Sequence, residues 1–134
     1  MPTRREVVEQ FIPHSPLVGH LGIRVERLQQ DRAELVLPFA EHNVTIGDVV
    51  HGGAISTLID TAGMAAAWSD DGEAGASGST ISLSVDFAAP AAKTAVRAVA
   101  EVYRRGRSTC FVAVTATDEA GAVVAKGLVT HRFA

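Results

Sequence analysis

The sequence predicts an α+β domain in which a curved antiparallel sheet wraps around one long central helix. A mostly apolar, strongly helical run covers residues 52–68. Six strand-like runs flank it, two before and four after, and most are joined by short turn segments. Consecutive antiparallel strands with one buried helix are typical of this two-layer class. At 134 residues, the chain is expected to form a single domain, residues 1–134, with one substantial core.

The first element is expected to be an amphipathic helix within residues 1–13. In "REVVEQFI" the apolar residues recur at helical spacing from Val7 to Ile12, and Pro13 is expected to end the helix. The following "PLVGHLG" is expected to be a loop because of its proline and glycines.

The strands are expected from alternating runs. "IRVERLQ" and "RAELVLPF" predict a hairpin, and "AEHNVTIGDV" is expected to be an irregular connection into the central helix. After the turn-rich loop "SDDGEAGASG", the last four strands are expected in "STISLSVDFAAP", "AVRAVAEVYRR", "STCFVAVTATD" and "AVVAKGLVTHRF". A long sheet that faces one short helix leaves an edge and a face uncovered, which predicts a dimer.

The central helix begins unusually, with His51, Gly52 and Gly53. Glycines allow a tight turn and let another group approach the backbone closely. The first N–H groups of a helix have no intrahelical partner and carry the positive end of the helix dipole. This segment is therefore a candidate oxyanion site for a polarised carbonyl, and a simple turn into the helix is the alternative.

An acid, Asp60, interrupts the apolar run of the same helix. Burying an unpaired carboxylate is costly, so an acid at this position is a candidate for a functional site. The alternative is an interface salt bridge or hydrogen bond.

The spacing of these two features predicts a site shared between subunits. Gly52 and Asp60 are eight positions apart, which is about 12 Å along a helix axis. A single carbonyl group cannot easily contact both Gly52 and Asp60 of the same helix. If both groups act on one bond, the helix start of one subunit must lie beside Asp60 of another, and a two-fold dimer then has two equivalent sites.

Composition excludes several other classes. The formal net charge of −3 argues against a general nucleic-acid coat, and the apolar runs are shorter than the roughly 18 residues that span a membrane. Neither a signal peptide nor a membrane anchor is expected. Cys110 is the only cysteine, so it is expected to be a small buried side chain in a reducing, cytoplasmic protein.

The segment "HNVTIGDVVHGGAISTLIDTAG" resembles the hotdog-fold acyl-CoA thioesterases. It is most similar to the PaaI-type subgroup of the phenylacetate pathway, which is related to the 4-hydroxybenzoyl-CoA thioesterases. The resemblance covers residues 16–133 and includes "SVDFAAPA", "RRGRSTCFVAVTATDEAG" and "VVAKGLVTHRF". It implies a thioester hydrolase that converts an aryl-, arylacetyl- or medium-chain acyl-CoA to the free acid and CoA, in a homodimer that assembles to a homotetramer.

The resemblance also implies roles for individual residues. The Gly52 amide would hold the thioester oxygen, and Asp60 would be the general base or the nucleophile. An upstream asparagine, Asn43, would assist at the carbonyl, and Thr80 would help to place the water. His51 either orients the glycine turn through its ring or is purely structural. The expected catalytic set is Asp60, Gly52, Asn43, His51 and Thr80, with Gly53 contacting the substrate.

The segment "YRRGRS" is a second candidate for binding. It is either a solvated turn between two strands or a clamp for the phosphates of CoA, which arginine recognises well. With the resemblance, Arg105, Arg107 and Ser108 are the expected CoA contacts.

No cofactor is expected, because coenzyme A is part of the substrate, and the five histidines lack the paired spacing of a metal site. Two other functions stay open: a hotdog hydratase or dehydratase, and a non-catalytic acyl-CoA-binding module. The absence of an acid–histidine motif around the central helix argues against the first. The presence of Asp60 argues against the second.

Overall fold

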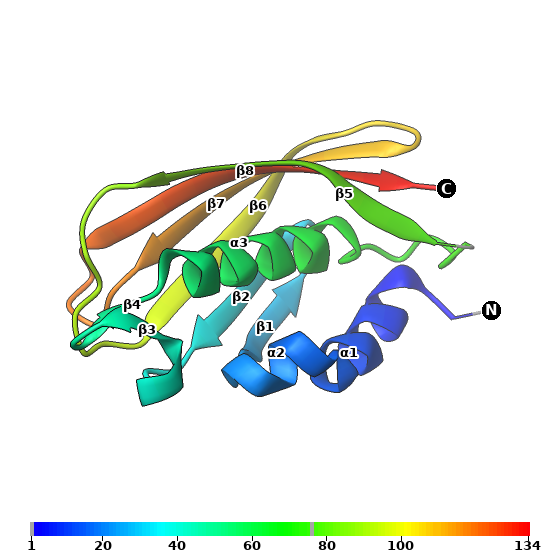
Figure 1. Cartoon of the computed structure of the whole chain (residues 1–134). Helices are drawn as coiled ribbons and strands as arrows, with labels where there is room; N and C mark the ends of the chain where they lie inside the picture. The colour runs from blue at the N-terminus through cyan, green and yellow to red at the C-terminus, as the bar shows by residue number, and fades with distance from the viewer. Residues whose placement is uncertain (1, 76) are drawn as a thin grey trace.

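The computed structural model describes residues 2–75 and 77–134. A large antiparallel sheet covers the central helix α3 (Gly52–Ala67), and two short helices, α1 (Arg4–His14) and α2 (Pro16–Leu21), lie beside strand β1 (Figure 1). This arrangement confirms the predicted α+β class. The central helix begins at the predicted residue and ends one residue earlier than the expected range 52–68.

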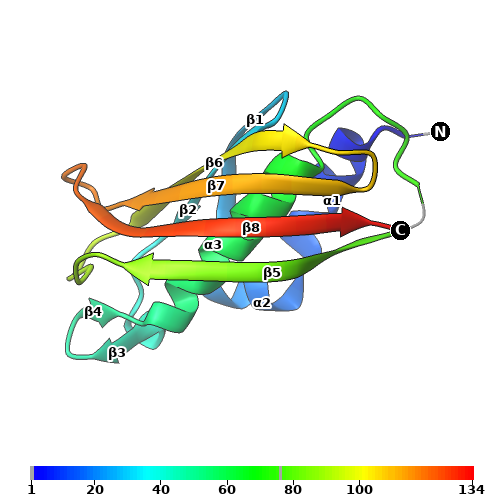
Figure 2. The ribbon, with the colours of Figure 1, turned by 90° about the horizontal axis from the view of Figure 1, so that it is seen from above.

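The sheet contains all six predicted strands, which pair antiparallel in the order β1-β2-β6-β7-β8-β5 (Figure 2). β5 and β1 are therefore its two edges. The strands are β1 (Arg24–Gln29), β2 (Arg32–Leu37), β5 (Gly78–Phe87), β6 (Val96–Arg105), β7 (Thr109–Thr117) and β8 (Val123–Phe133).

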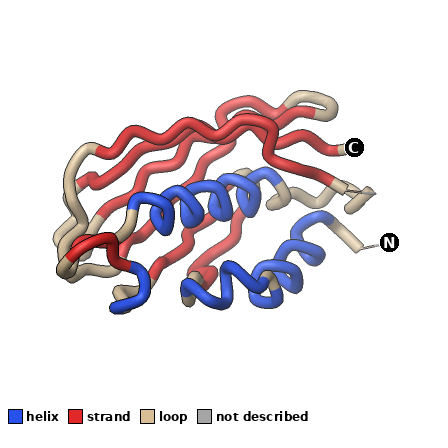
Figure 3. The backbone as a smooth tube through the Cα atoms, in the orientation of Figure 1, coloured by secondary structure: helices blue, strands red, loops and turns tan. Residues whose placement is uncertain are grey.

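The expected loop over "PLVGHLG" is instead helix α2, so that prediction was wrong (Figure 3). Pro16 occupies the first helical position, where its missing N–H costs nothing, and Gly22 ends the helix in a left-handed conformation with φ of 76°. Val18 and Leu21 are buried. Burial of these two side chains stabilises a turn of helix that the glycines alone would not favour.

The expected irregular connection before α3 also has regular structure. It forms a short 3-10 helix, η1 (Glu41–Asn43), and a small two-stranded sheet of β3 (Val44–Ile46) and β4 (Val49–Val50). The tight turn between these strands includes Gly47, whose φ is 58°. This small sheet leads the chain into the start of α3.

Helix α1 begins with a capping box, in which Thr3 and Glu6 satisfy each other's backbone N–H groups. Pro13 does not end the helix as expected but lies in its last turn, and α1 continues to His14. A proline in the last turn removes the hydrogen bond that its own N–H would donate, and little of the helix follows it. The buried residues of α1 are Val8 and Ile12, as the predicted helical spacing indicates.

The close contact between α3 and the sheet depends on two glycines. A Cβ atom on Gly63 would lie 2.7 Å from Val129, and one on Gly127 would lie 2.7 Å from Ile59. The helix and strand β8 therefore approach more closely than any pair with side chains at these positions would allow. This contact fixes the height of α3 above the sheet.

Cys110 lies on β7 and is fully buried as a free thiol. Burial raises the pKa of the Cys110 thiol above its ordinary value. This is the apolar packing role that the sequence predicts. None of the helices in the described part of the chain is long and apolar enough to cross a membrane.

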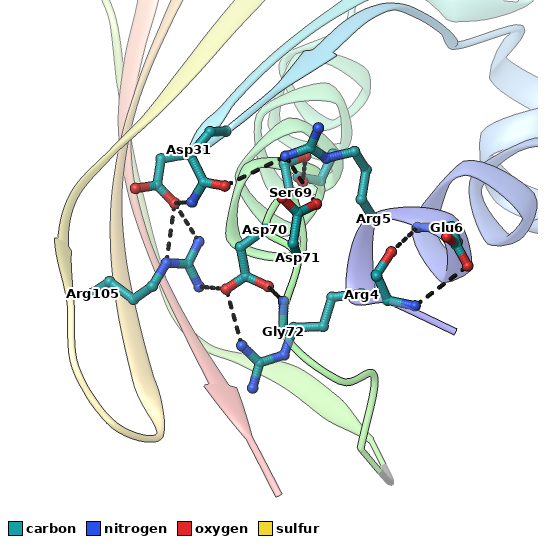
Figure 4. A network of polar contacts seen from close by, with 12 residues as sticks. Arg4, Arg5, Glu6, Asp31, Ser69, Asp70, Asp71, Gly72 and Arg105 are labelled. Carbon is teal, nitrogen blue, oxygen red and sulfur yellow. Dashed lines mark hydrogen bonds and ion pairs between the residues drawn. The ribbon is translucent and has the colours of Figure 1, made fainter. Parts of the chain in front are cut away.

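A network of charged side chains ties α1 to the rest of the domain (Figure 4). Asp70 lies just after α3, and its Oδ2 atom is 3.1 Å from Arg4 Nη1 and 3.0 Å from Arg105 Nη1. Arg105 also donates two hydrogen bonds to Asp31, at 3.0 and 2.8 Å. The backbone N–H groups of Arg4 and Arg5 donate to the carbonyls of Gly72 and Asp70. The network thus joins α1, the segment after α3, the β1–β2 turn and β6.

We predict that Asp70→Asn lowers the free energy of unfolding by about 2 kcal/mol, because it leaves two partly buried guanidinium groups without their shared carboxylate. Asp71→Asn is the matched control: the Asp71 carboxylate is 77% exposed, against 11% for Asp70. Urea unfolding measures both, and we expect Asp71→Asn to stay close to the wild type. Equal losses in the two variants would contradict a structural role for the network.

Candidate active site

Asp60 lies on the face of α3 that borders a cavity, which we call the Asp60 cavity. The cavity has a volume of about 380 Å³ and lies between α1, α3 and the start of β5. Most of its lining is apolar, and the Asp60 side chain is half-buried in its wall. The carboxylate is therefore neither in bulk solvent nor sealed in the core, which is the position that a reactive acid needs.

Among the described residues, one hydrogen bond holds the Asp60 carboxylate. Thr80 Oγ1 donates to Asp60 Oδ1 at 2.7 Å. Thr80 is brought there by edge strand β5, which pairs with β8 and crosses close to α3. The second oxygen, Oδ2, accepts no hydrogen bond from any residue in the described ranges. Sequence reasoning placed Thr80 near the reacting water, and the structure brings it into direct contact with Asp60.

The start of α3 is organised by His51. The imidazole Nδ1 accepts a hydrogen bond from the Gly53 N–H at 2.7 Å, so His51 is the N-cap of the helix. The His51 carbonyl accepts from the N–H groups of Ala54 and Ile55. Of the two expected roles for His51, the geometry corresponds to orienting the glycine turn.

The Gly52 N–H is left free by this arrangement. Within residues 2–75 and 77–134, it donates no hydrogen bond, whereas the Gly53 N–H is occupied by the His51 ring. The free amide points out of the positive end of the helix dipole. It is the better oxyanion donor of the two, and Gly53 is occupied by the cap rather than free to bind a substrate.

Gly52 borders a second cavity, of about 350 Å³, which we call the Gly52 cavity. It lies at the opposite end of α3 from the helix terminus at Ala67, and residues of β4 and the end of β5 line it. The ring of Phe87 stands 3.3 Å from the position of a Cβ atom on Gly52. Gly52 and Asp60 therefore belong to different cavities, about 12 Å apart along one helix.

Asn43 does not reach either cavity. Its side chain is buried and donates to the backbone carbonyls of Leu21 at 3.3 Å and Pro38 at 3.5 Å. Its own carbonyl accepts from the His51 N–H at 2.7 Å. Instead of the predicted contact with the substrate carbonyl, Asn43 holds the segment that precedes the helix start. The spacing between Asn43 and His51 places its amide under α2 rather than in front of Gly52.

Of the three side chains that are expected to contact CoA, one already forms ion pairs within the chain. Arg105 is ion-paired with Asp31 and Asp70, so its guanidinium is not free to hold a phosphate. The pairing joins residues 74 and 35 positions apart, which no local pattern reveals. Arg107 and Ser108 lie exposed in the β6–β7 turn.

Sequence reasoning missed His131, which lines the Asp60 cavity although it is buried. Trp68 Nε1 donates to His131 Nε2 at 2.9 Å, and the His131 Nδ1 atom has no partner among the described residues. Burial lowers the pKa of His131 below its ordinary value; the nearby Asp60 carboxylate opposes this shift and Arg4 adds to it. His131 is therefore a neutral ring at neutral pH. Its position in the alternating strand β8 was the only sequence signal.

In the described part of the chain, no group of three or more histidine, cysteine, aspartate or glutamate side chains is placed to hold a metal ion. The candidate reactive groups among the described residues are the Asp60 carboxylate, which accepts a hydrogen bond from the Thr80 hydroxyl, and the Gly52 N–H at the start of α3. A polarising amide and a carboxylate that can activate water are the groups that hydrolysis of an activated ester requires.

The fold and these groups define a hotdog thioester hydrolase. A family profile described as "Thioesterase superfamily" matches residues 47–125, and the chain belongs to that family. The curated Mycobacterium tuberculosis protein "Putative esterase Rv1847" is 33% identical over 116 residues, which cover 85% of this chain and 83% of that protein.

Two solved structures have the same fold. A thioesterase family protein from Silicibacter pomeroyi superposes with a TM-score of 0.87 at 26% identity, covering 96% of both chains. The E. coli PaaI protein from the phenylacetic acid degradation operon superposes with a TM-score of 0.84 at 18% identity, covering 98% of this chain and 94% of that one. The predicted thioesterase family and hotdog fold are thereby confirmed. At 18% identity, the likeness to PaaI concerns the fold alone.

We predict that His131 makes the fold less stable as the pH falls. The unfolded imidazole takes up a proton near its ordinary pKa of about 6.5, whereas the folded one, with its lowered pKa, does not. Stability is therefore fully present above this pH and decreases below it, by at most about 1.4 kcal/mol per pH unit for this residue.

His131→Gln tests this prediction, because glutamine keeps an acceptor for Trp68 and does not titrate. Free energies of unfolding measured between pH 8 and pH 5 should fall more steeply for the wild type than for the variant. Parallel pH profiles would show that the His131 pKa is not shifted.

Proposed function

We propose that this protein is an acyl-CoA thioesterase of the PaaI type, related to the 4-hydroxybenzoyl-CoA thioesterases. It hydrolyses an aryl-, arylacetyl- or medium-chain acyl-CoA to the free acid and CoA. The active unit is a homodimer, which assembles further to a homotetramer in the cytoplasm. It uses no cofactor beyond the CoA of its substrate and has neither a nucleic acid nor a membrane as a partner.

One observation carries the proposal: a free helix amide and a hydroxyl-bound carboxylate stand at separate cavities along one helix. The Gly52 amide borders one cavity and Asp60 borders the other. Each cavity holds half of what thioester hydrolysis requires. In a two-fold dimer, the Gly52 cavity of one subunit would meet the Asp60 cavity of the other and complete two equivalent sites.

Strand β5 is the surface that we propose for this dimer. It is an edge strand with unpaired backbone groups, and it passes both cavities. Large apolar side chains are exposed along it, including Ile81 at 55% and Phe87 at 54%. A second copy that pairs with β5 would cover both the edge and these side chains.

The chemistry follows from the two half-sites. The Gly52 N–H would donate to the thioester oxygen and stabilise the oxyanion that forms when the carbonyl carbon is attacked. With Asp60 as general base, a water oxygen attacks and its proton passes to the carboxylate. The C–S bond then breaks, and the CoA thiolate leaves and takes up a proton. With Asp60 as nucleophile, the carboxylate itself expels the thiolate, and water hydrolyses the resulting anhydride.

The Thr80 hydroxyl leaves Asp60 with one free oxygen in either mechanism. Because Thr80 occupies Oδ1, the reaction would use Oδ2, and the hydrogen bond would fix the direction of that oxygen. Arg107 and Ser108 are the remaining CoA contacts that we propose, since both are exposed and Arg107 has no ion pair among the described residues. A pure acyl-CoA-binding module would have no use for a carboxylate in this position.

We predict that Asp60→Asn and Asp60→Ala lower kcat for phenylacetyl-CoA or octanoyl-CoA by more than about a hundredfold, because neither side chain activates water or attacks the thioester. Release of CoA thiol measures the rate. Asp71→Asn, which removes an exposed carboxylate outside both cavities, is the control and should keep the wild-type rate. An unchanged rate in the Asp60 variants would exclude the proposed role of Asp60.

We also predict that two inactive variants complement each other. Gly52→Pro removes the proposed oxyanion N–H and adds a side chain beside Phe87. Proline is well accepted at the first position of a helix, and the extended backbone of His51 suits a following proline. Gly52→Ala adds a side chain but keeps the N–H, and it is the matched control.

When Asp60→Ala and Gly52→Pro subunits are mixed and re-assembled, half of the dimers should be mixed, each with one intact site. About a quarter of the wild-type rate should return if the site is shared between subunits. If each subunit holds a complete site, the mixture should stay inactive, and the shared-site proposal would be wrong.

A further inference from the structure

The Asp60 cavity extends away from the carboxylate along α3. Its lining on this helix is Asp60, Thr61, Met64 and Trp68, which lie on one helical face. From Asp60 to Trp68 the helix rises by about 12 Å. The cavity is therefore a slot that runs from the reacting group toward the end of α3, with Trp68 at its far end.

The opposite wall of this slot comes from α1. Val8, Phe11 and Ile12 all line it. Val8 and Ile12 are buried, whereas Phe11 is 57% exposed although it borders an apolar cavity. An aromatic side chain of this size, half out of the core and beside a slot, can bury more of its surface when the slot is filled.

Helix α1 is held in place by its buried residues Val8 and Ile12 and, at its first turn, by ion pairs and backbone hydrogen bonds. The two ion pairs of Asp70, to Arg4 and Arg105, anchor its first turn to the segment that follows Trp68. Arg4 also lies over the ring of Phe133, with its guanidinium carbon 3.9 Å from the ring centre. The wall therefore has a fixed position relative to the far end of the slot.

The described residues that line the slot include no cationic side chain that could balance a charged acyl group. Thr61 Oγ1 donates to the Thr57 carbonyl, and His131 Nε2 accepts from Trp68. No lysine or arginine is among the residues that line the cavity in the described part of the chain. A carboxylate at the distal end of an acyl group would be buried there without a counter-ion and in the same cavity as the Asp60 carboxylate, which is costly.

The profile of the Thioesterase superfamily matches residues 47–125, which include Gly52, Asp60 and Thr80 but not α1. The wall formed by α1 thus lies outside the segment that this chain shares with the family profile. Reactive groups and pocket wall come from different parts of the sequence.

We propose that α1 forms the wall that selects the acyl group, and that Phe11 is a specificity-determining residue. The inference rests on the proposed function and assigns the substrate class of that site: an uncharged, apolar acyl group that extends along the slot from Asp60 toward Trp68. Phe11 packs against this group from α1, so its size sets how long or wide a group fits. Acyl groups with a second carboxylate are excluded.

The test compares kcat/KM for butanoyl-, octanoyl-, dodecanoyl-, phenylacetyl- and succinyl-CoA in the wild type, Phe11→Ala and Phe11→Trp. Leu17→Ala is the matched control, because Leu17 is 55% exposed on the adjacent helix and does not line the cavity. Phe11→Trp should lower kcat/KM for octanoyl- and dodecanoyl-CoA by about tenfold relative to butanoyl-CoA, and Phe11→Ala should shift the preference to longer groups. Leu17→Ala should keep the wild-type profile.

Two outcomes would overturn the inference. One is a chain-length profile in both Phe11 variants that equals that of the wild type and of Leu17→Ala. The other is hydrolysis of succinyl-CoA as efficient as that of butanoyl-CoA.

Binding separates this inference from the proposed function. If the wild type hydrolysed none of these thioesters, the proposed function would fail, and calorimetric binding of octanoyl-CoA to the same variants would still test the wall. Weaker binding to Phe11→Trp than to Leu17→Ala would support it, and equal binding would overturn it.

Discussion

The architecture depends on one constraint, which is that a single rigid helix carries both reactive groups at fixed separation. The Gly52 amide and Asp60 lie about 12 Å apart on α3, so neither can approach the other within one chain. The close contact of Gly63 and Gly127 with the opposite element packs this helix tightly against β8. Edge strand β5 passes both groups, and it supplies Thr80 at one and Phe87 at the other. The helix, the edge and the two cavities therefore form one geometric unit.

The two reactive groups on α3 are positioned by different physical means. At the start, the ring of His51 occupies the Gly53 N–H, which leaves the Gly52 N–H as the exposed positive end of the dipole. Asn43 acts one step further away, since its carbonyl holds the His51 N–H. In the middle of the helix, the Asp60 carboxylate is directed by the Thr80 hydroxyl in a mostly apolar cavity. In the described part of the chain, the Gly52 N–H and the Asp60 Oδ2 atom thus both stay unpaired, because His51 binds the adjacent Gly53 N–H and Thr80 binds Asp60 Oδ1.

The fold was predictable where periodicity is strong and local. The central helix and all six strands of the large sheet follow from apolar spacing, and the position of Asp60 on an apolar helix marked it as exceptional. Helix α2 was missed because burial of Val18 and Leu21 outweighs the propensity of its glycines and proline, and burial is not visible locally. The site was harder to predict. Arg105 looked like a free cation in a turn, but its partners Asp31 and Asp70 come from remote segments. His131 looked like an ordinary strand residue until the sheet brought it beside Asp60.

The charged network fixes the first turn of α1 through groups that do not face the cavity. Its anchors, Arg4 and the backbone of its first turn, contact Asp70 and Gly72 and leave the cavity-facing side chains out of the network. Residues such as Phe11 can therefore change size without loss of the ion pairs that position the helix. By contrast, Thr61 and Met64 lie on α3, where a change of size also affects the packing that sets the distance between Gly52 and Asp60. If the slot holds the acyl group, α1 is the wall where a change of selectivity disturbs the reactive groups least.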